Sequence, residues 1–181
     1  MRTEKNRIAL AGASRAAEKA IQAASAPELA QIPDDEKSAW AMAAIIHCDV
    51  VRLFVALEEC EREGIARLLW LGNIASQLYE AAKWYDSEGM AAIRKIAERK
   101  PLGIAHVNEK VIALRKNHRI HRVRKYANYR NKLGYHYGAS AISHLKNLGS
   151  EDAGEFFNLL TSFVKFSGDW ARLTKDLLQS R

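Results

Sequence analysis

The fold is decided by residues 33–62, which read PDDEKSAWAMAAIIHCDVVRLFVALEECER. Apolar side chains recur here every three or four residues, which is the spacing that places them on one face of an α-helix. Three acidic residues follow Pro33, and acidic side chains favour the first turn of a helix because they complement its dipole. We therefore predict a central buried helix over residues 34–62, with an apolar stripe made of Trp40, Ala44, His47, Val51 and Phe54.

The same spacing extends along most of the chain, whereas period-two alternation and Asn-Gly hairpin turns are absent from it. Pro101 and Gly103 mark a loop, and residues 87–89 mark either a break or a kink. We expect the other helices at 4–24, at 65–99 with that break or kink inside it, and at 106–132, 139–147 and 150–181. Two of them carry long stripes: Leu71, Ile74, Leu78, Ala82 and Tyr85 in one, and Leu160, Phe163, Ser167, Trp170, Leu173 and Leu177 in the other. The pattern predicts one domain, 1–181, that folds as an all-α, up-and-down bundle of five to six helices.

Length and composition limit the class of protein. A chain of 181 residues can bury enough surface to fold without disulfides or metals. Cys48 and Cys60 lie in apolar helical sequence without metal-ligand spacing, so we interpret both as reduced, small hydrophobic residues. The first residues carry charges and lack the apolar region of a signal peptide, and no uninterrupted apolar run is long enough to span a membrane. We expect a soluble, cytoplasmic protein that has no contact with a membrane.

The net charge of +7 comes from one part of the chain. Residues 110–150 hold ten Lys or Arg and no Asp or Glu, whereas the other residues hold 18 basic and 21 acidic side chains. The basic stretch also contains four of the six histidines and the tyrosines at 126, 129, 135 and 137. A charge run is often only a solvated face. Cations interleaved with aromatic rings, however, suit phosphate contacts and base stacking, and we therefore predict RNA as the partner of this face.

If residues 106–132 form one helix, we expect one of its faces to be exposed and basic and another to pack on the core. Arg115, Arg119 and Arg122 are spaced by four and three residues and would share one exposed ridge. Ile120, Val123 and Ala127 would form a second face that packs on the core. We predict a nucleic-acid-binding set that consists of Arg115, Lys116, Arg119, Arg122, Lys125, Lys132 and Tyr137.

The exit of that helix brings a candidate site together. Arg130 and His136 would lie about 120° apart on a continuous helix. Gly134 and Gly138 favour a helix end and a turn, after which an arginine of the last turn and a histidine of the loop can converge.

Arg130-Asn131 followed by His136 resembles the Arg-x(4–6)-His signature of the HEPN superfamily, with five residues between the Arg and the His and a polar residue directly after the Arg. HEPN domains are helical bundles, often homodimers, and many are metal-independent ribonucleases of toxin–antitoxin, phage-defence and RNA-processing systems. The resemblance implies a HEPN-like bundle in which two copies of the motif face each other across a homodimer. It also implies that an antitoxin or another regulatory protein is a possible partner. Four tryptophans are many for a bundle of this size and favour such an interface.

Metal-free RNA cleavage requires these residue types. Histidine titrates near neutral pH and can move protons to and from the reacting oxygens. A guanidinium offers paired donors to a phosphate as negative charge develops on it. Following the resemblance, we assign His136 as the acid/base, Arg130 as the group that stabilises the transition state, and Asn131 as an orienting residue. Lys132 and Tyr137 are helpers, and neither a metal nor another cofactor is expected.

Other interpretations stay open. Arg130 could cap helix carbonyls while His136 is a surface loop residue. The chain could be a HEPN-like module that binds nucleic acid or dimerises without catalysis, or a helical adaptor whose basic ridge meets an acidic protein. His118 and His121 have a spacing that could hold a metal, but no carboxylate lies near them in the sequence. Asp49 and Arg52 are expected to form a partly buried ion pair rather than a site with His47 and Cys48.

Overall fold

The computed structural model describes residues 2–60, 65–100, 103–127 and 153–179, and throughout these ranges the regular structure is helical. The predicted all-α bundle is thus confirmed. Its α-helices are α1 (Arg2–Ala24), α2 (Asp34–Glu59), α3 (Ile65–Asp86), α4 (Glu88–Glu98), α5 (Gly103–His118) and α8 (Ala153–Gln179). Two 3₁₀ segments, η1 (Pro27–Leu29) and η2 (Ile120–Tyr126), complete the described elements.

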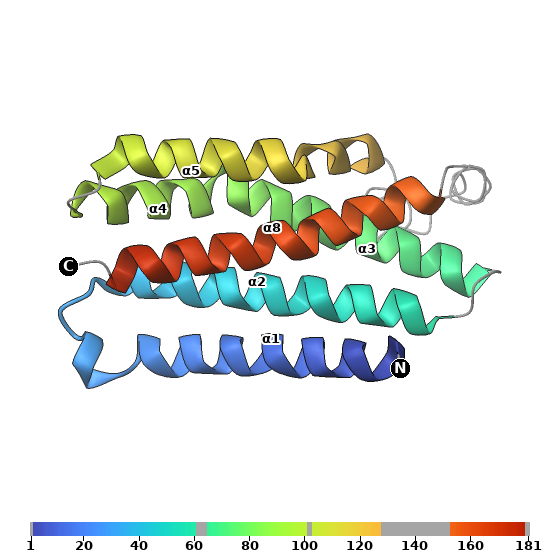
Figure 1. The fold of residues 1–181 in the computed structure, drawn as a ribbon, viewed down its shortest axis with the longest axis horizontal. Coiled ribbons are helices and arrows are strands. Elements are labelled where there is room, and N and C mark those ends of the chain that lie inside the picture. Colours follow the sequence, from blue (N-terminus) through green and yellow to red (C-terminus); the bar gives the residue numbers. More distant parts are fainter. Residues whose placement is uncertain (1, 61–64, 101–102, 128–152, 180–181) are drawn as a thin grey trace.

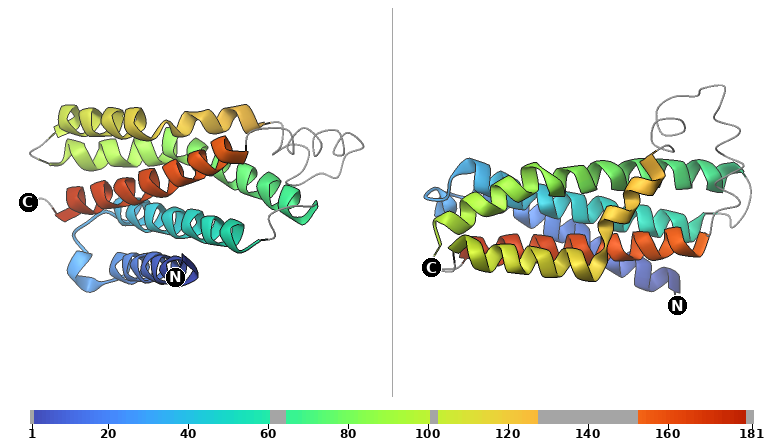
Figure 2. Two further views of the ribbon diagram at one scale, coloured as in Figure 1. Left: turned by 45° about the vertical axis from the view of Figure 1, so that its right-hand side comes forward. Right: turned by 90° about the horizontal axis from the view of Figure 1, so that it is seen from above.

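The long helices lie side by side along one axis (Figure 1). Helix α1 lies on the outside and packs on α2, which in turn packs on α8. On the other side of α8 lie α5 and α4, and α3 and α4 follow one another along the bundle (Figures 1 and 2). Helix α8 is therefore enclosed by neighbours along most of its length, as its long apolar stripe predicts.

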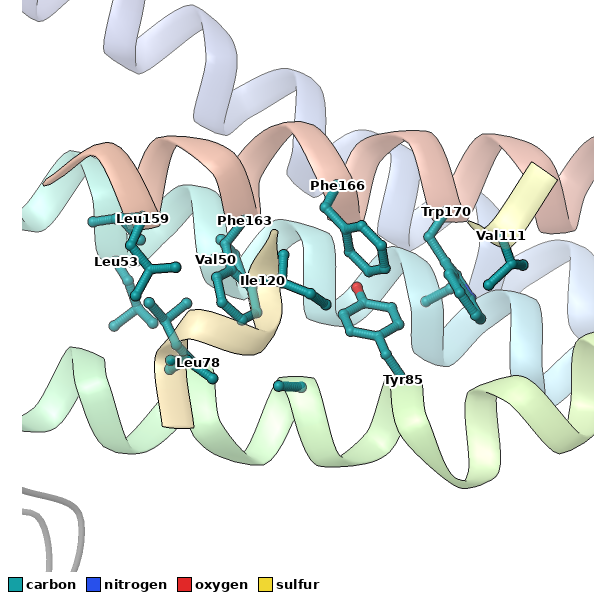
Figure 3. Close-up of a cluster of buried hydrophobic side chains, with 14 of the residues drawn as sticks. Val50, Leu53, Leu78, Tyr85, Val111, Ile120, Leu159, Phe163, Phe166 and Trp170 are labelled. Carbon is teal, nitrogen blue, oxygen red and sulfur yellow. The ribbon is translucent and has the colours of Figure 1, made fainter. Parts of the chain in front are cut away.

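Aromatic rings fill the core between α3 and α8 (Figure 3). Phe163 and Phe166 are fully buried, and Trp170 is 1% exposed. The Tyr85 ring lies 4.9 Å from that of Phe166 and 5.1 Å from that of Trp170, in tilted and edge-on arrangements that aromatic pairs prefer. The predicted stripe of α3 is buried throughout, and in the α8 stripe only Leu173 is half-buried.

Small side chains of α1 make much of its contact with α2, where they meet alanines as well as Val51 and Val55. Ala13, Ala17 and Ala20 of α1 are buried at a spacing of four and three residues, and Ala41 and Ala44 of α2 pack with the last two. Alanine lets two helices approach closely, but it buries little apolar area for each residue. This interface is therefore thinner than the aromatic core on the other side of α2.

The structure corrects one helix boundary and decides a second one, which the sequence left open between a break and a kink. Helix α2 ends at Glu59 because the backbone of Cys60 is extended (φ −70°, ψ 153°), three residues before the predicted end at 62. Residues 87–89 are a break, since Ser87 leaves helical geometry between α3 and α4. Gly89 follows at once, and a Cβ atom there would lie 2.7 Å from the Trp84 ring, so only glycine allows this close approach. The predicted helix at 139–147 lies outside the described residues.

Helix α2 is long and apolar enough, by length and composition, to cross a membrane, although its apolar residues do not form one uninterrupted run. Within the bundle, 44% of that apolar stretch is buried, and α1 and α8 pack on the helix. A helix in the core of a bundle passes the same test of length and composition.

Candidate functional site

The predicted catalytic residues Arg130, Asn131 and His136, with Lys132 and Tyr137, lie outside the described residues. The chain enters their stretch after η2 and returns from it at α8. The last residues of η2 touch the first turn of α8: the Tyr126 and Phe156 rings lie 5.0 Å apart, and Lys125 forms an ion pair with Glu155. The end of η2 and the beginning of α8, which flank this stretch in the sequence, therefore lie side by side (Figure 1).

The helix predicted over 106–132 is interrupted, and this is a correction. Helix α5 ends at His118, and Arg119 adopts a left-handed conformation (φ 45°, ψ 37°). Residues 120–126 then form η2, which turns away from the axis of α5 towards α3 (Figure 2). Arg115, Arg119 and Arg122 consequently do not form one helical ridge.

The sequence of η2 explains its 3₁₀ geometry. Ile120, Val123 and Tyr126 are 3%, 0% and 2% exposed, and they belong to the main core. A 3₁₀ helix has three residues per turn, so side chains at this uniform spacing of three lie above one another. In an α-helix each step of three would rotate the side chain by about 60° away from alignment. Burial of all three residues on one side of the segment therefore favours the tighter helix.

Part of the basic stretch is neutralised by acidic residues from other helices. Asp86 ends α3, where a carboxylate opposes the helix dipole. Arg115 Nη1 lies 2.5 Å from Asp86 Oδ1, and Arg124 Nη2 lies 3.0 Å from Oδ2. Arg115 also donates to the carbonyl oxygen of Tyr85 at 3.1 Å, so it caps the end of α3. The sequence indicated a run without counter-ions, and the structure corrects this.

Lys125 and Tyr126 also make contacts that hold η2 against α8. The Lys125 Nζ atom lies 2.5 Å from Glu155 Oε2 and 4.7 Å from the centre of the Tyr126 ring. Partial burial by itself would lower the pKa of Lys125, but the contacts with Glu155 and Tyr126 raise this pKa above its ordinary value. Because Tyr126 is buried, its ring is not available for base stacking, contrary to the sequence interpretation.

Arg119, Arg122 and Lys116 differ from these cations. All three are exposed, and none has an ion-pair partner within residues 2–60, 65–100, 103–127 and 153–179. Arg119 and Arg122 line a cleft of about 150 Å³ between the α5–η2 junction and the first turns of α8. The cleft is completed by side chains that carry hydrogen-bonding groups, together with one leucine: Asn117, His118, Glu155, Asn158, Leu159 and Ser162. Two guanidinium groups beside amide groups suit the oxygens of a phosphate.

His118 is positioned by α8 rather than by the rest of the basic stretch. Its Nε2 atom lies 3.1 Å from Asp169 Oδ2, and Arg172 Nη1 lies 3.1 Å from the other oxygen of the same carboxylate. His121 is exposed two residues beyond Arg119 and does not join this contact. Within the described part of the chain, no three His, Cys, Asp or Glu side chains gather as metal ligands would.

Helix α8 also holds a second histidine, His47 of α2, through a partner that the sequence did not predict. His47 Nδ1 lies 2.9 Å from Ser167 Oγ, and the Ser167 hydroxyl donates to the carbonyl oxygen of Val164 at 3.1 Å. A hydroxyl has one proton, so the hydroxyl accepts from Nδ1–H of His47. Burial, with a smaller effect of Arg172, lowers the pKa of His47, while Asp169 opposes this shift. The signal in the sequence is a serine inside an otherwise apolar stripe.

The remaining polar candidates of α2 are structural. Arg52 donates to Asp49 at 2.7 Å, as predicted, and the Asp49 side chain is half-buried while that of Arg52 is exposed. Cys48 and Cys60 are free thiols. Burial, followed by the nearby Asp49 charge, raises the pKa of Cys48, which makes this thiol less reactive.

No protein-family model, curated protein or solved structure matches this chain.

Proposed function

We propose that this chain is a cytoplasmic RNA-binding protein that cleaves RNA without a metal, as an endoribonuclease of the HEPN type. The observation that carries the proposal is the exposed Arg119–Arg122 pair in its cleft, without ion-pair partners among the described residues. The cleft lies against η2 and α8, whose touching ends flank the stretch that holds Arg130, Asn131 and His136. The proposal requires that RNA bound at these arginines also reaches the proposed catalytic residues.

The structure divides the predicted nucleic-acid-binding residues into two groups. Arg115 and Lys125 hold elements of the fold together through Asp86 and Glu155. Lys116, Arg119 and Arg122 remain for the phosphates of RNA. Phosphate contacts of this kind give affinity that falls with salt, because each neutralised phosphate releases counter-ions.

The proposed reaction needs only groups of the chain and of RNA. A base, His136 of one motif, takes the proton from a ribose 2′-hydroxyl, and the oxygen attacks the adjacent phosphorus. Arg130 stabilises the charge that develops on the phosphate, and Asn131 orients the reacting groups. The bond to the 5′-oxygen breaks, and that oxygen receives a proton from an acid, which is the second histidine if two motifs face each other. The products are a 2′,3′-cyclic phosphate and a 5′-hydroxyl.

A homodimer is part of the proposal, because it would bring two copies of His136 together. The tryptophans no longer support it. Trp170 is buried, and Trp40, Trp70 and Trp84 pack against the core of their own chain. Sedimentation at micromolar concentration tests the dimer, and a monomer at all concentrations would remove the shared site.

Catalysis is tested with a labelled structured RNA in EDTA between pH 5 and 9. We expect the wild type to leave 2′,3′-cyclic phosphate ends and His136→Ala to leave the RNA intact, with its fold and RNA affinity retained. Equal cleavage by both proteins would refute the assignment of His136.

The alternative function is RNA binding without cleavage, and the described cations favour it in one respect: they account for binding by themselves. Intact RNA with both proteins, together with salt-dependent binding, would establish this alternative. A protein that prefers an acidic peptide to RNA would instead be an adaptor.

Binding is tested separately through Arg122→Gln. We expect RNA affinity to fall several-fold and the slope of log K against log salt to decrease by about one. Arg94→Gln is the matched control, because Arg94 is an exposed arginine of α4 that lies outside the cleft. An equal effect of the two substitutions would show that the cleft is not the RNA-binding surface.

A further inference from the structure

A second cavity lies at the opposite end of α8 from the Arg119–Arg122 cleft. Its volume is about 530 Å³, within the range of small-molecule sites in proteins. The ends of α1, α4 and α8 enclose it, together with η1 and the first turns of α2. Since α8 has 27 residues, its two ends lie roughly 40 Å apart. The cavity is therefore separate from the proposed RNA surface.

One side of the cavity is apolar. Leu29, Ile32 and Trp40 contribute half-buried side chains to its lining, and Leu178 is 8% exposed. An aliphatic or aromatic group of a ligand would lose its contact with water against this wall, and removal of apolar area from water favours binding.

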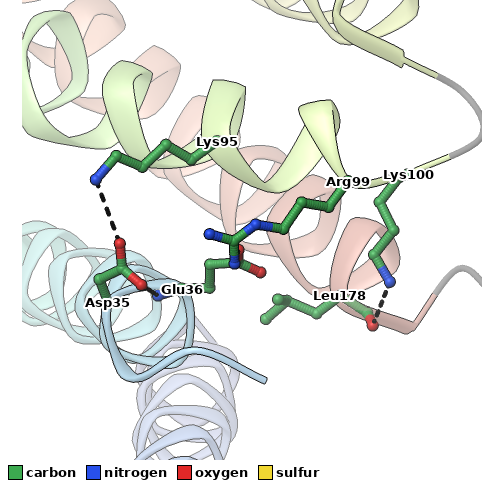
Figure 4. A network of polar contacts seen from close by, with 6 residues as sticks. All are labelled: Asp35, Glu36, Lys95, Arg99, Lys100 and Leu178. Atoms are coloured by element: carbon green, nitrogen blue, oxygen red, sulfur yellow. Dashed lines mark hydrogen bonds and ion pairs between the residues drawn. The ribbon is translucent and has the colours of Figure 1, made fainter. Parts of the chain in front are cut away.

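The other side of the cavity carries the cations Arg99, Lys100 and Lys175 and the carboxylate of Glu36; Figure 4 shows Glu36, Arg99 and Lys100 with their contacts. Glu36, whose side chain is 5% exposed, pairs with Arg99 at 2.5 Å, and the Lys100 ammonium donates to the carbonyl oxygen of Leu178 at 3.3 Å. The contact with Glu36 engages one of the five guanidinium N–H donors of Arg99. Lys175 also lines the cavity and is exposed, without an ion-pair partner in the described ranges.

The charges that line the cavity indicate the chemical class of its ligand. One buried carboxylate is neutralised by Arg99, which leaves a net positive side next to the apolar wall. We propose that the cavity binds a small amphipathic carboxylate, such as a medium-chain alkyl or aryl acid. Its carboxylate accepts from Arg99 and Lys175, and its apolar part packs against Leu29, Ile32 and Trp40. A neutral molecule of the same shape leaves these donors without an acceptor and binds less tightly.

The test is calorimetric titration of the full chain with octanoate, and with octan-1-ol for comparison. We expect saturable binding of octanoate and at least tenfold weaker binding of the alcohol. Lys175→Gln should weaken octanoate binding about tenfold, because it removes a charge-assisted hydrogen bond. Arg99 is unsuitable for this test, since its removal would leave the buried Glu36 carboxylate unpaired.

Two further variants separate a specific site from general adsorption. Lys165→Gln changes an exposed lysine of the same helix outside the cavity and should leave octanoate affinity unchanged. Ala23→Phe places a ring at the cavity wall and should abolish binding while the thermal unfolding curve stays two-state. Absence of saturable octanoate binding to the wild type would overturn the proposal. It would also be overturned by equal affinity for the alcohol, or by octanoate binding that neither Lys175→Gln nor Ala23→Phe changes.

Discussion

Helix α8 and the 3₁₀ segment η2 both place apolar side chains in the same core, yet they do so with different geometries. In α8 the buried positions alternate between spacings of three and four over 27 residues, which only an α-helix satisfies. In η2 the buried positions are 120, 123 and 126, and over so short a segment this uniform spacing favours a 3₁₀ helix without excluding an α-helix. A long pattern defines its own helix type, whereas a short one depends on what it packs against.

The largest effect on stability is expected for a residue of the long pattern. Phe163→Ala removes a fully buried ring from the centre of α8 and should lower the free energy of unfolding by about 3–5 kcal/mol. Urea denaturation measures the change. Lys165→Ala, at an exposed position two residues later, should stay within about 0.5 kcal/mol of the wild type.

A smaller but clear effect is expected in η2. Val123→Ala removes two methyl groups from a fully buried position and should cost about 2 kcal/mol by the same measurement. Ile112→Ala is the matched control, because Ile112 is 65% exposed on the neighbouring α5 and should change stability little. Equal and small effects would mean that η2 rests loosely on the core, and the comparison with α8 would then lose its basis.

The junction between α5 and η2 should respond with the opposite sign. The left-handed conformation of Arg119 costs about 1 kcal/mol for a residue with a Cβ atom and almost nothing for glycine. Arg119→Gly should therefore raise the free energy of unfolding by up to about 1 kcal/mol, less the greater entropy of glycine in the unfolded chain. Arg122→Gly, in the ordinary helical region, should be destabilising. Destabilisation of similar size in both variants would contradict the assigned helix break.

The smallest expected effect is a dependence of stability on pH through His47, which packs against α8. The pKa of His47 is lowered in the folded chain by burial, so the unfolded chain binds a proton first as pH falls. The stability that this residue contributes is present above its unfolded pKa of about 6.5 and is lost below it. His47→Gln should flatten the decline in stability between pH 7 and pH 5, measured by denaturation at each pH. Parallel profiles for the two proteins would show that His47 does not titrate in this way.

The sequence was sufficient wherever a pattern was long or a residue type was restrictive. The stripes of α3 and α8, the acidic first turn of α2 and the break near Gly89 follow from spacing and local stereochemistry. The end of α5 could not be predicted in the same way. The residues around Arg119 contain neither glycine nor proline, and the break depends on burial of Ile120, Val123 and Tyr126 against other helices.

The candidate site shows the same division. The distribution of charge in the sequence located the basic stretch, and a resemblance to the HEPN motif pointed to Arg130, Asn131 and His136. Only the tertiary structure decided which cations are neutralised, because Asp86 lies 29 residues from Arg115 and 38 from Arg124. Charges pair according to distance in space, and that distance is set by how α3, η2 and α8 pack together. The sequence therefore determined which residues carry charge, and the packing of the helices determined which of them remain for a ligand.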